Sequence, residues 1–185
     1  MTVSWGDLRK GMAIEIDGTP YELIDYERQK MQQREPVTKM RLRDLRTGRS
    51  MVKTFQSTQW PVADVETRAD QYLYFDGRDY IIMDNETFEQ THLSKGQIGE
   101  GVSFLIENME LELVQYKGET LNVRLPTFVN LKVTSTAPGF RGDTATGGGK
   151  PATVETGLTL QVPLHIKNGD LIKVDTRTGE YVEKA

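Results

Sequence analysis

The sequence predicts an all-β protein that is divided into three small modules. Short runs of alternating apolar and polar residues recur along the chain, and a period of two is typical of half-buried strands. Turn pairs such as Asp17-Gly18 and Asp76-Gly77 separate neighbouring runs, as they do in β-hairpins. Proline interrupts the pattern at Pro61 and again at Pro126, which indicates module boundaries there. The predicted modules are residues 1–64, 65–127 and 128–185.

The first module is predicted to be a small barrel, because it holds four short strands and a fifth is compatible with the pattern. These strands are expected at 12–16, 21–24, 37–45 and 51–55. A polar loop, residues 29–36, precedes the third of them. In that strand Lys39, Arg41 and Arg43 should share one face, and Met40 and Leu42 the other. The segment from Trp60 to Asp64 is expected to be a boundary.

The central module is predicted to open with a hairpin of residues 72–75 and 80–83. A single helical turn is expected at 94–98, and further strands at 102–106, 109–114 and 121–125. The third module should begin with a strand at 128–133, followed by a long loop, residues 135–150, and strands at 158–162, 171–174 and 180–182. A loop of that length between strands is usually functional or disordered.

Charge is distributed unevenly along the chain. The whole chain carries a net charge of −4, but the segment from Arg28 to Lys53 carries +7. The three predicted modules carry +2, −7 and +1 in order. A dense cationic patch on an acidic protein favours phosphate of a nucleic acid as its partner, and the acidic central module should be repelled by RNA.

Several classes of function are disfavoured. The chain has no cysteine, so disulfides, thiolate metal sites and thiol catalysis are excluded. Neither a signal peptide nor an apolar run long enough for a membrane span is present, so we expect a cytoplasmic protein without membrane contacts. His92 and His165 have no second histidine at ligand spacing, and a packed or surface histidine is the simpler interpretation.

The glycine-rich stretch before Lys150 is not a phosphate-binding loop. Thr144 and Pro151 stand where that motif needs glycine and a hydroxyl residue. Glu110 and Glu112 should share a strand face, where a solvated acidic surface is the simpler interpretation. No nucleophile–base set is evident. We therefore expect a binding factor without cofactor or metal, and not an enzyme.

The segment from Lys150 to Gly169 resembles the signature of the bacterial translation elongation factor P family. That pattern reads Lys-x-Ala, four residues, Gly, two residues, an aliphatic residue, x-Val-Pro, two residues, an aliphatic residue, two residues and Gly, and every fixed position matches. The segments 85–90, 138–144 and 174–181 also look like the family. The resemblance covers nearly the full length.

The resemblance implies an SH3-like (KOW-type) barrel followed by two OB-fold barrels, arranged in an L that mimics tRNA. It implies a monomer that binds both subunits of stalled ribosomes beside the peptidyl-tRNA and promotes peptide-bond formation at consecutive prolines. The tip loop, with Lys30, Met31, Gln32, Gln33 and Arg34, would enter the peptidyl-transferase centre. The loop of Gly142, Asp143 and Thr144 would lie near the exit-site codon, and Tyr181 against small-subunit RNA.

The tip departs from the family pattern. Members commonly read Pro-Gly-Lys-Gly there, with a lysine that is extended by modification, and others carry arginine. The spacing from Asp17-Gly18 to Thr47-Gly48 matches the common pattern without gaps, which puts Gln33 at the modified position. Glutamine has no ε-amine to modify, although Arg34 follows. The tip is therefore either an active polar tip or a variant turn without chemistry at Gln33.

The predicted mechanism is positioning of the acceptor end, not supply of an acid or base. The residues expected to bind tRNA or ribosomal RNA are Arg28, Lys39, Arg41, Arg43, Arg49 and Lys53. Three alternatives stay open: a related factor that serves other stalling motifs, a generic OB-fold protein that binds single-stranded nucleic acid, and an enzyme that uses the tip loop. For the basic strand, the alternative is a solvated charged face.

Overall fold

The computed structural model describes residues 1–30, 36–139 and 148–185, and its regular elements are nearly all strands. The chain separates into two compact units, residues 1–68 with 113–123, and residues 69–112 with 124–185. The predicted all-β class is confirmed. The boundaries of the three predicted modules stay a prediction, because the two compact units are divided at other residues and are not three modules.

The first unit is built around a four-stranded antiparallel sheet of order β2–β3–β4–β5. Its strands are β2 (Ala13–Ile16), β3 (Thr19–Gln29), β4 (Val37–Asp44) and β5 (Ser50–Phe55). The sheet curls around a core whose buried side chains include Leu8, Ile14, Leu23, Met40, Leu42 and Trp60. The predicted alternation of β4 is confirmed, since Met40 and Leu42 are buried while Lys39, Arg41 and Arg43 are exposed.

The segment expected to be a boundary, from Trp60 to Asp64, begins inside a strand, and the boundary itself stays a prediction. Residues Gln59–Pro61 form strand β6, which pairs with β1 (Thr2–Ser4) in a separate two-stranded sheet. The Trp60 ring is buried and packs edge-on against Phe55. Pro61 lies in a short strand with a single partner, a position where a missing N–H is tolerated. The large aromatic side chain of Trp60 therefore belongs to the core of the first unit.

The central sheet has the order β11–β10–β7–β8–β9. Its strands are β7 (Val65–Phe75), β8 (Tyr80–Asp84), β9 (Gln90–Leu93), β10 (Glu110–Tyr116) and β11 (Glu119–Arg124). The helical turn is confirmed as α1 (Lys95–Ile98). Ser94 and Gln97 form a capping box at its N-terminus. The strand expected at 102–106 is wrong, because Gly99–Phe104 is a 3-10 helix, η2, that extends α1.

The remaining sheet, in the second unit, has the order β14–β13–β12–β15–β16. Its strands are β12 (Phe128–Thr136), β13 (Gly149–Val154), β14 (Thr159–Pro163), β15 (Leu171–Asp175) and β16 (Tyr181–Lys184). Strand β13 was not predicted, because Pro151 and two glycines conceal its alternation. Its inward residues Ala152 and Val154 join a core with Leu131, Val162 and Ile172.

Residues 113–123, which are most of the β10–β11 hairpin, belong to the first unit, although most of the sheet lies in the second. Val114, Tyr116 and Leu121 are buried with Leu45 and Ala63. The Tyr116 hydroxyl donates a hydrogen bond to the Glu15 carboxylate, and Lys117 lies 3.4 Å from the same group. The tyrosine hydroxyl, followed by Lys117, holds the pKa of Glu15 below its usual value.

The turn between β15 and β16 is closed by an arginine–carboxylate pair. Arg177 donates from Nε and Nη2 to the two oxygens of Asp175, at 3.1 and 2.7 Å, and the backbone N–H of Arg177 donates to Oδ1 at 2.8 Å. Together these donors, the guanidinium first, lower the pKa of Asp175 to about 2. Such bidentate pairs fix geometry as well as contributing energy.

Leu42→Ala should lower the free energy of unfolding of the first module by about 2–5 kcal/mol, because it leaves a cavity beside a fully buried side chain. Both tryptophans of the chain, Trp5 and Trp60, pack in this core, so their fluorescence during urea unfolding reports on it. The control Val52→Ala, at an exposed position of the neighbouring strand, should change little. Equal effects of the two variants would contradict this core.

Asp175→Asn should lower the thermal unfolding temperature at pH 6, and the gap from wild type should close as pH falls. A carboxyl whose pKa is lowered on folding stabilises the protein above its unfolded pKa of about 4, and this contribution is lost as pH falls through the folded pKa of about 2. Calorimetry between pH 6 and 2 tests this. Glu180→Gln, at an exposed position of the same turn, serves as control. A gap for Asp175→Asn that stays constant with pH would contradict the pairing.

Candidate nucleic-acid interface

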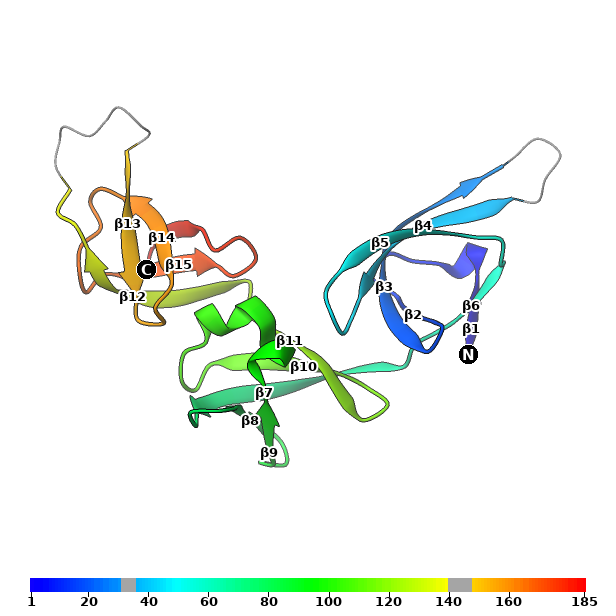
Figure 1. The fold of residues 1–185 in the computed structure, drawn as a ribbon, viewed down its shortest axis with the longest axis horizontal. Coiled ribbons are helices and arrows are strands. Elements are labelled where there is room, and N and C mark those ends of the chain that lie inside the picture. Colours follow the sequence, from blue (N-terminus) through cyan, green and yellow to red (C-terminus); the bar gives the residue numbers. More distant parts are fainter. Residues whose placement is uncertain (31–35, 140–147) are drawn as a thin grey trace. The chain divides into compact units, whose positions relative to one another are not determined.

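The β3–β4 hairpin is the most extended feature of the first unit. Its strands pair from Tyr21 with Asp44 out to Gln29 with Val37. Strand β2 covers β3 only as far as Glu22, so the outer part of β3 has β4 as its ladder partner. On this side the hairpin therefore projects beyond β2 (Figure 1), while β5 pairs with β4 from Arg43 out to Thr38. The hairpin carries the segment with the highest density of positive charge in the sequence.

The cations of β4 face a row of carboxylates on β3. The register sets Glu22 opposite Arg43, Asp25 opposite Arg41 and Glu27 opposite Lys39. Lys39 Nζ lies 3.4 Å from Glu27, and Arg43 Nη1 lies 3.6 Å from Glu22. A shallow pocket of about 210 Å³ lies on this face. Its lining residues are Asp25, Tyr26, Glu27, Lys39, Arg41 and Val52.

This acidic row was missed in the sequence, for a physical reason. Strict alternation would put Glu22, Ile24 and Tyr26 on one face of β3. A bulge between Leu23 and Asp25 adds one residue to the strand, and an extra residue reverses the facing of all that follow. The bulge thereby brings Asp25 and Glu27 onto the face of Glu22. The charge of +7 counted along the sequence is partly neutralised in space.

The other predicted RNA-binding cations lie around the same sheet. Arg28 lies 5.2 Å above the Trp5 ring. Lys53 lies 3.6 Å from Asp17 and 5.4 Å from the centre of the Phe55 ring. Arg49 is exposed beside the turn between β4 and β5. All six predicted cations are exposed, as a phosphate-binding surface requires, and several are held by carboxylates or rings.

The predicted tip is only partly described. Lys30 is exposed at the outer end of the hairpin, next to the end of β3. Met31, Gln32, Gln33 and Arg34 lie outside the described residues, as do Gly142, Asp143 and Thr144. Tyr181 is half-buried at the start of β16, and its ring packs against the core of the C-terminal sheet. This tyrosine therefore has a packing role, and the RNA contact that the family resemblance implies stays a prediction.

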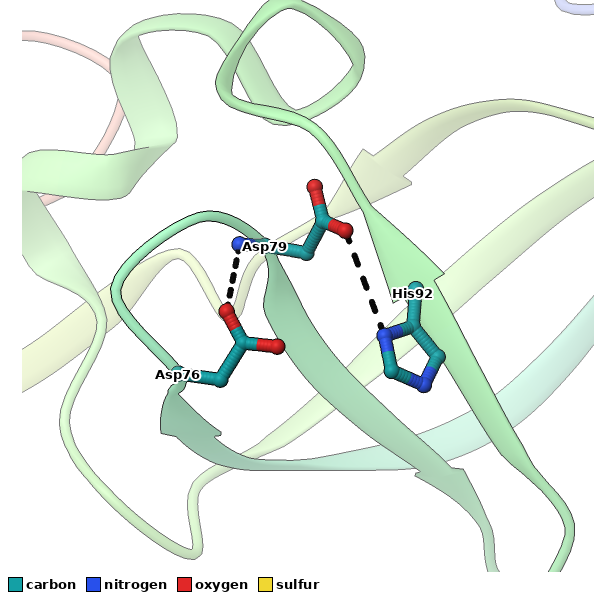
Figure 2. Close-up of side chains that lie close together, drawn as sticks. All are labelled: Asp76, Asp79 and His92. Carbon is teal, nitrogen blue, oxygen red and sulfur yellow. Dashed lines mark hydrogen bonds and ion pairs between the residues drawn. The ribbon is translucent and has the colours of Figure 1, made fainter.

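One trio of potential metal ligands lies elsewhere, at the β7–β8 turn. Figure 2 shows Asp76, Asp79 and His92 pointing toward one another. Asp76 Oδ1 accepts hydrogen bonds of 2.8 Å from the backbone N–H groups of Arg78 and Asp79, and these lower the pKa of Asp76. Asp79 lies 4.0 Å from the His92 ring nitrogen. The turn thus accounts for the Asp76 carboxylate, and an ion pair with Arg78 at 3.8 Å accounts for that of Asp79.

Within the described residues, no helix is long and apolar enough to cross a membrane. The longest regular elements are the strands β3 and β7, of 11 residues each.

Comparisons with known proteins match three consecutive segments of the chain to three domain families. Residues 4–59 match the elongation factor P KOW-like domain, residues 65–123 the elongation factor P OB domain, and residues 129–184 the elongation factor P C-terminal domain. The fold is also similar to a solved structure, eukaryotic translation initiation factor 5A from Methanococcus jannaschii. That similarity has a TM-score of 0.52 at 25% identity, over 66% of this chain and 95% of that one.

Similarity to individual relatives extends over the full length. Elongation factor P of Thermodesulfovibrio yellowstonii is 45% identical over 183 residues, which are 98% of each chain. Elongation factor P of Desulforudis audaxviator is 46% identical over 184 residues, 99% of this chain and 100% of that one. With three matching domains in the expected order and this level of identity, the chain belongs to the elongation factor P family.

Proposed function

We propose that this translation elongation factor binds stalled ribosomes beside the peptidyl-tRNA and promotes peptide-bond formation, especially at consecutive prolines. Family membership makes the chain a translation factor that works with the ribosome, and not a conventional enzyme. The proposal adds the site and the mechanism. The observation that carries it is the long β3–β4 hairpin with its exposed cations, whose strands are joined by a polar segment of the sequence.

The proposed mechanism is orientation. Proline is a poor nucleophile in peptidyl transfer, and a proline-rich nascent chain can misplace the reacting carbonyl. A factor that holds the acceptor end in a productive geometry raises the rate without donating or accepting a proton itself. Lys39, Arg41 and Arg43 bind RNA phosphates in this scheme, while Gln33 or Arg34 donates hydrogen bonds to the terminal nucleotides. The ribosome performs the chemistry.

The carboxylates of β3 limit how this surface binds RNA. A phosphate that approaches β4 must compete with Glu27 for Lys39 and with Glu22 for Arg43, while Asp25 is paired with Lys10 at 2.7 Å. Exposed ion pairs contribute at most about 1 kcal/mol, so several phosphates together can displace them. The carboxylates also reduce nonspecific attraction to RNA. We propose that the alternating charges favour binding of a tRNA acceptor end that the ribosome holds in one position. Other nucleic acid would be bound more weakly.

Three further expectations belong to the same proposal. The modules 1–64, 65–127 and 128–185 act as a KOW-type and two OB-type domains, supported by the three family domains that match in this order. The loop of Gly142, Asp143 and Thr144 contacts RNA beside the exit-site codon, and Tyr181 contacts small-subunit RNA. The factor acts as a monomer in the cytoplasm and contacts both ribosomal subunits.

A related factor for other stalling motifs is the second candidate, and Gln33 favours it because a glutamine replaces the usual modified residue. A generic single-strand binder is disfavoured by the central module. Tyr72 is buried, and Phe75 and Tyr80 pack on each other with ring centres 4.7 Å apart. The aromatic residues of this module, exposed ones included, also lie in a segment of net charge −7, which repels the backbone of a nucleic-acid strand.

Arg41→Glu with Arg43→Glu should abolish ribosome co-sedimentation at moderate salt, because two phosphate contacts become repulsions. Arg78→Glu with Lys95→Glu, at exposed positions of the acidic module, makes the same change in net charge and should leave binding intact. Glu27→Gln should strengthen binding, since it releases Lys39. If the double variant of β4 co-sedimented like wild type, this strand would not bind RNA.

The purified protein should increase full-length product from a reporter that encodes three consecutive prolines, and leave a proline-free reporter unchanged. If the tip is active, Gln33→Ala or Arg34→Ala should reduce this gain while ribosome binding persists, because the tip acts on the acceptor end after docking. No gain with wild type on the proline reporter, together with a gain on another stalling sequence, would select the second candidate. Full activity of both variants would show that the tip is a passive turn.

Native protein should have its unmodified mass at the tip, since glutamine offers no amine to extend. Mass spectrometry of the peptide from residues 29–36 checks this. An adduct on Lys30 or Arg34 would contradict the expectation.

A further inference from the structure

Side-chain hydrogen bonds link the end of strand β12 to strand β13. Strand β12 has an irregularity between Val133 and Ser135, where its ladder with β13 shifts register. Beyond this point, the Thr134 hydroxyl donates to the Thr153 carbonyl at 3.0 Å and the Thr136 hydroxyl donates to the Pro151 carbonyl at 2.9 Å. The backbone N–H of Thr136 donates to Asn168 Oδ1 at 2.7 Å. We call residues 134–139 and 148–151 the neck.

Lys150 makes the most unusual of these contacts. The residue is only 7% exposed, and its ammonium donates to the Ala137 carbonyl at 2.5 Å. Burial of a charged group is costly unless it is paired or hydrogen-bonded, and lysines are rarely buried to this extent. This ammonium joins the beginning of β13 to the segment that follows β12. Its placement thus has a cost that a surface lysine would avoid.

Gly139 adds a close approach between the neck and Leu164. A Cβ atom built at this position would lie 2.4 Å from the carbonyl oxygen of Leu164. No real Cβ is accommodated at that distance, so the backbone of Gly139 is seated directly against Leu164. The contact of Gly139 with Leu164 and that of Lys150 with Ala137 together fix the path of the chain from Ala137 to Gly139.

We propose that Lys150 is a positioning residue for ribosome binding, which holds the neck in one geometry through Ala137 without touching RNA itself. The inference rests on the proposed function, since it assumes that this end of the C-terminal module docks on ribosomal RNA. A surface that is ordered before binding loses less conformational entropy on binding. The buried ammonium therefore contributes to affinity through the shape of the neck.

Lys150→Met is the direct test, because methionine keeps the length of the buried stem and removes the donor. Affinity for stalled ribosomes should fall about ten-fold, as expected for loss of one link in a positioning network. The slope of log affinity against log salt should not change, since no phosphate contact is lost. Hydrogen exchange in the free protein should be faster at the amides of residues 134–137. Lys132→Met, at an exposed position of β12, is the control for loss of one positive charge and should leave this exchange unchanged.

The other outcomes are distinguishable. Unchanged affinity with unchanged exchange would overturn the inference, and a salt slope reduced by about one would show that Lys150 binds a phosphate directly. If wild type fails to bind ribosomes, the proposed function fails, and the exchange measurement alone decides whether Lys150 holds the neck. Should Lys150→Met not fold, Thr136→Val removes the bond to Pro151 with little change in shape. It should weaken binding in the same direction, and normal binding by this variant would overturn the inference.

Discussion

Buried and exposed residues alternate along strand β4, and the rest of the first unit depends on this alternation. It packs one face of the strand into the core and presents cations on the other. Its inward residues Met40 and Leu42 are fully buried, so their apolar contacts secure the strand. Its outward residues are exposed cations. Since both faces belong to one strand, the core underneath determines where each cation is presented. A shift of one residue in register would bury charge and expose the core, so the position of the cationic surface is set by hydrophobic packing.

The carboxylates opposite these cations change the character of the surface. A purely basic strand would bind any polyanion, and its affinity would fall steeply with salt. Two cross-strand ion pairs, Lys39 with Glu27 and Arg43 with Glu22, stabilise the pairing of β3 with β4 modestly. The cost is competition with phosphate for the same cations. Under the proposed function, the hairpin would therefore bind RNA with moderate affinity and would not strongly attract every polyanion at long range.

The sequence predicted the class of fold and most strands, because alternation and turn residues are local signals. The strand at β13 was missed since proline and glycine obscured its pattern, and η2 was predicted as a strand because a short apolar run fits either state. The acidic row on β3 required knowledge of a bulge, which local sequence does not reveal. The buried state of Lys150 was equally hidden, since lysine normally indicates solvent. Identification of the family came from spacing of fixed residues rather than from any physical pattern.

The central claim is that the outer end of the β3–β4 hairpin lies beside the acceptor end of the peptidyl-tRNA. The chain contains no cysteine, so Lys30→Cys creates a unique attachment point for an iron chelate that cleaves nearby nucleic acid. On ribosomes stalled at consecutive prolines, the account predicts cleavage of the peptidyl-tRNA within a few nucleotides of its 3′ end. Cleavage confined to RNA remote from the peptidyl-transferase centre, in a complex that still relieves stalling, would contradict it.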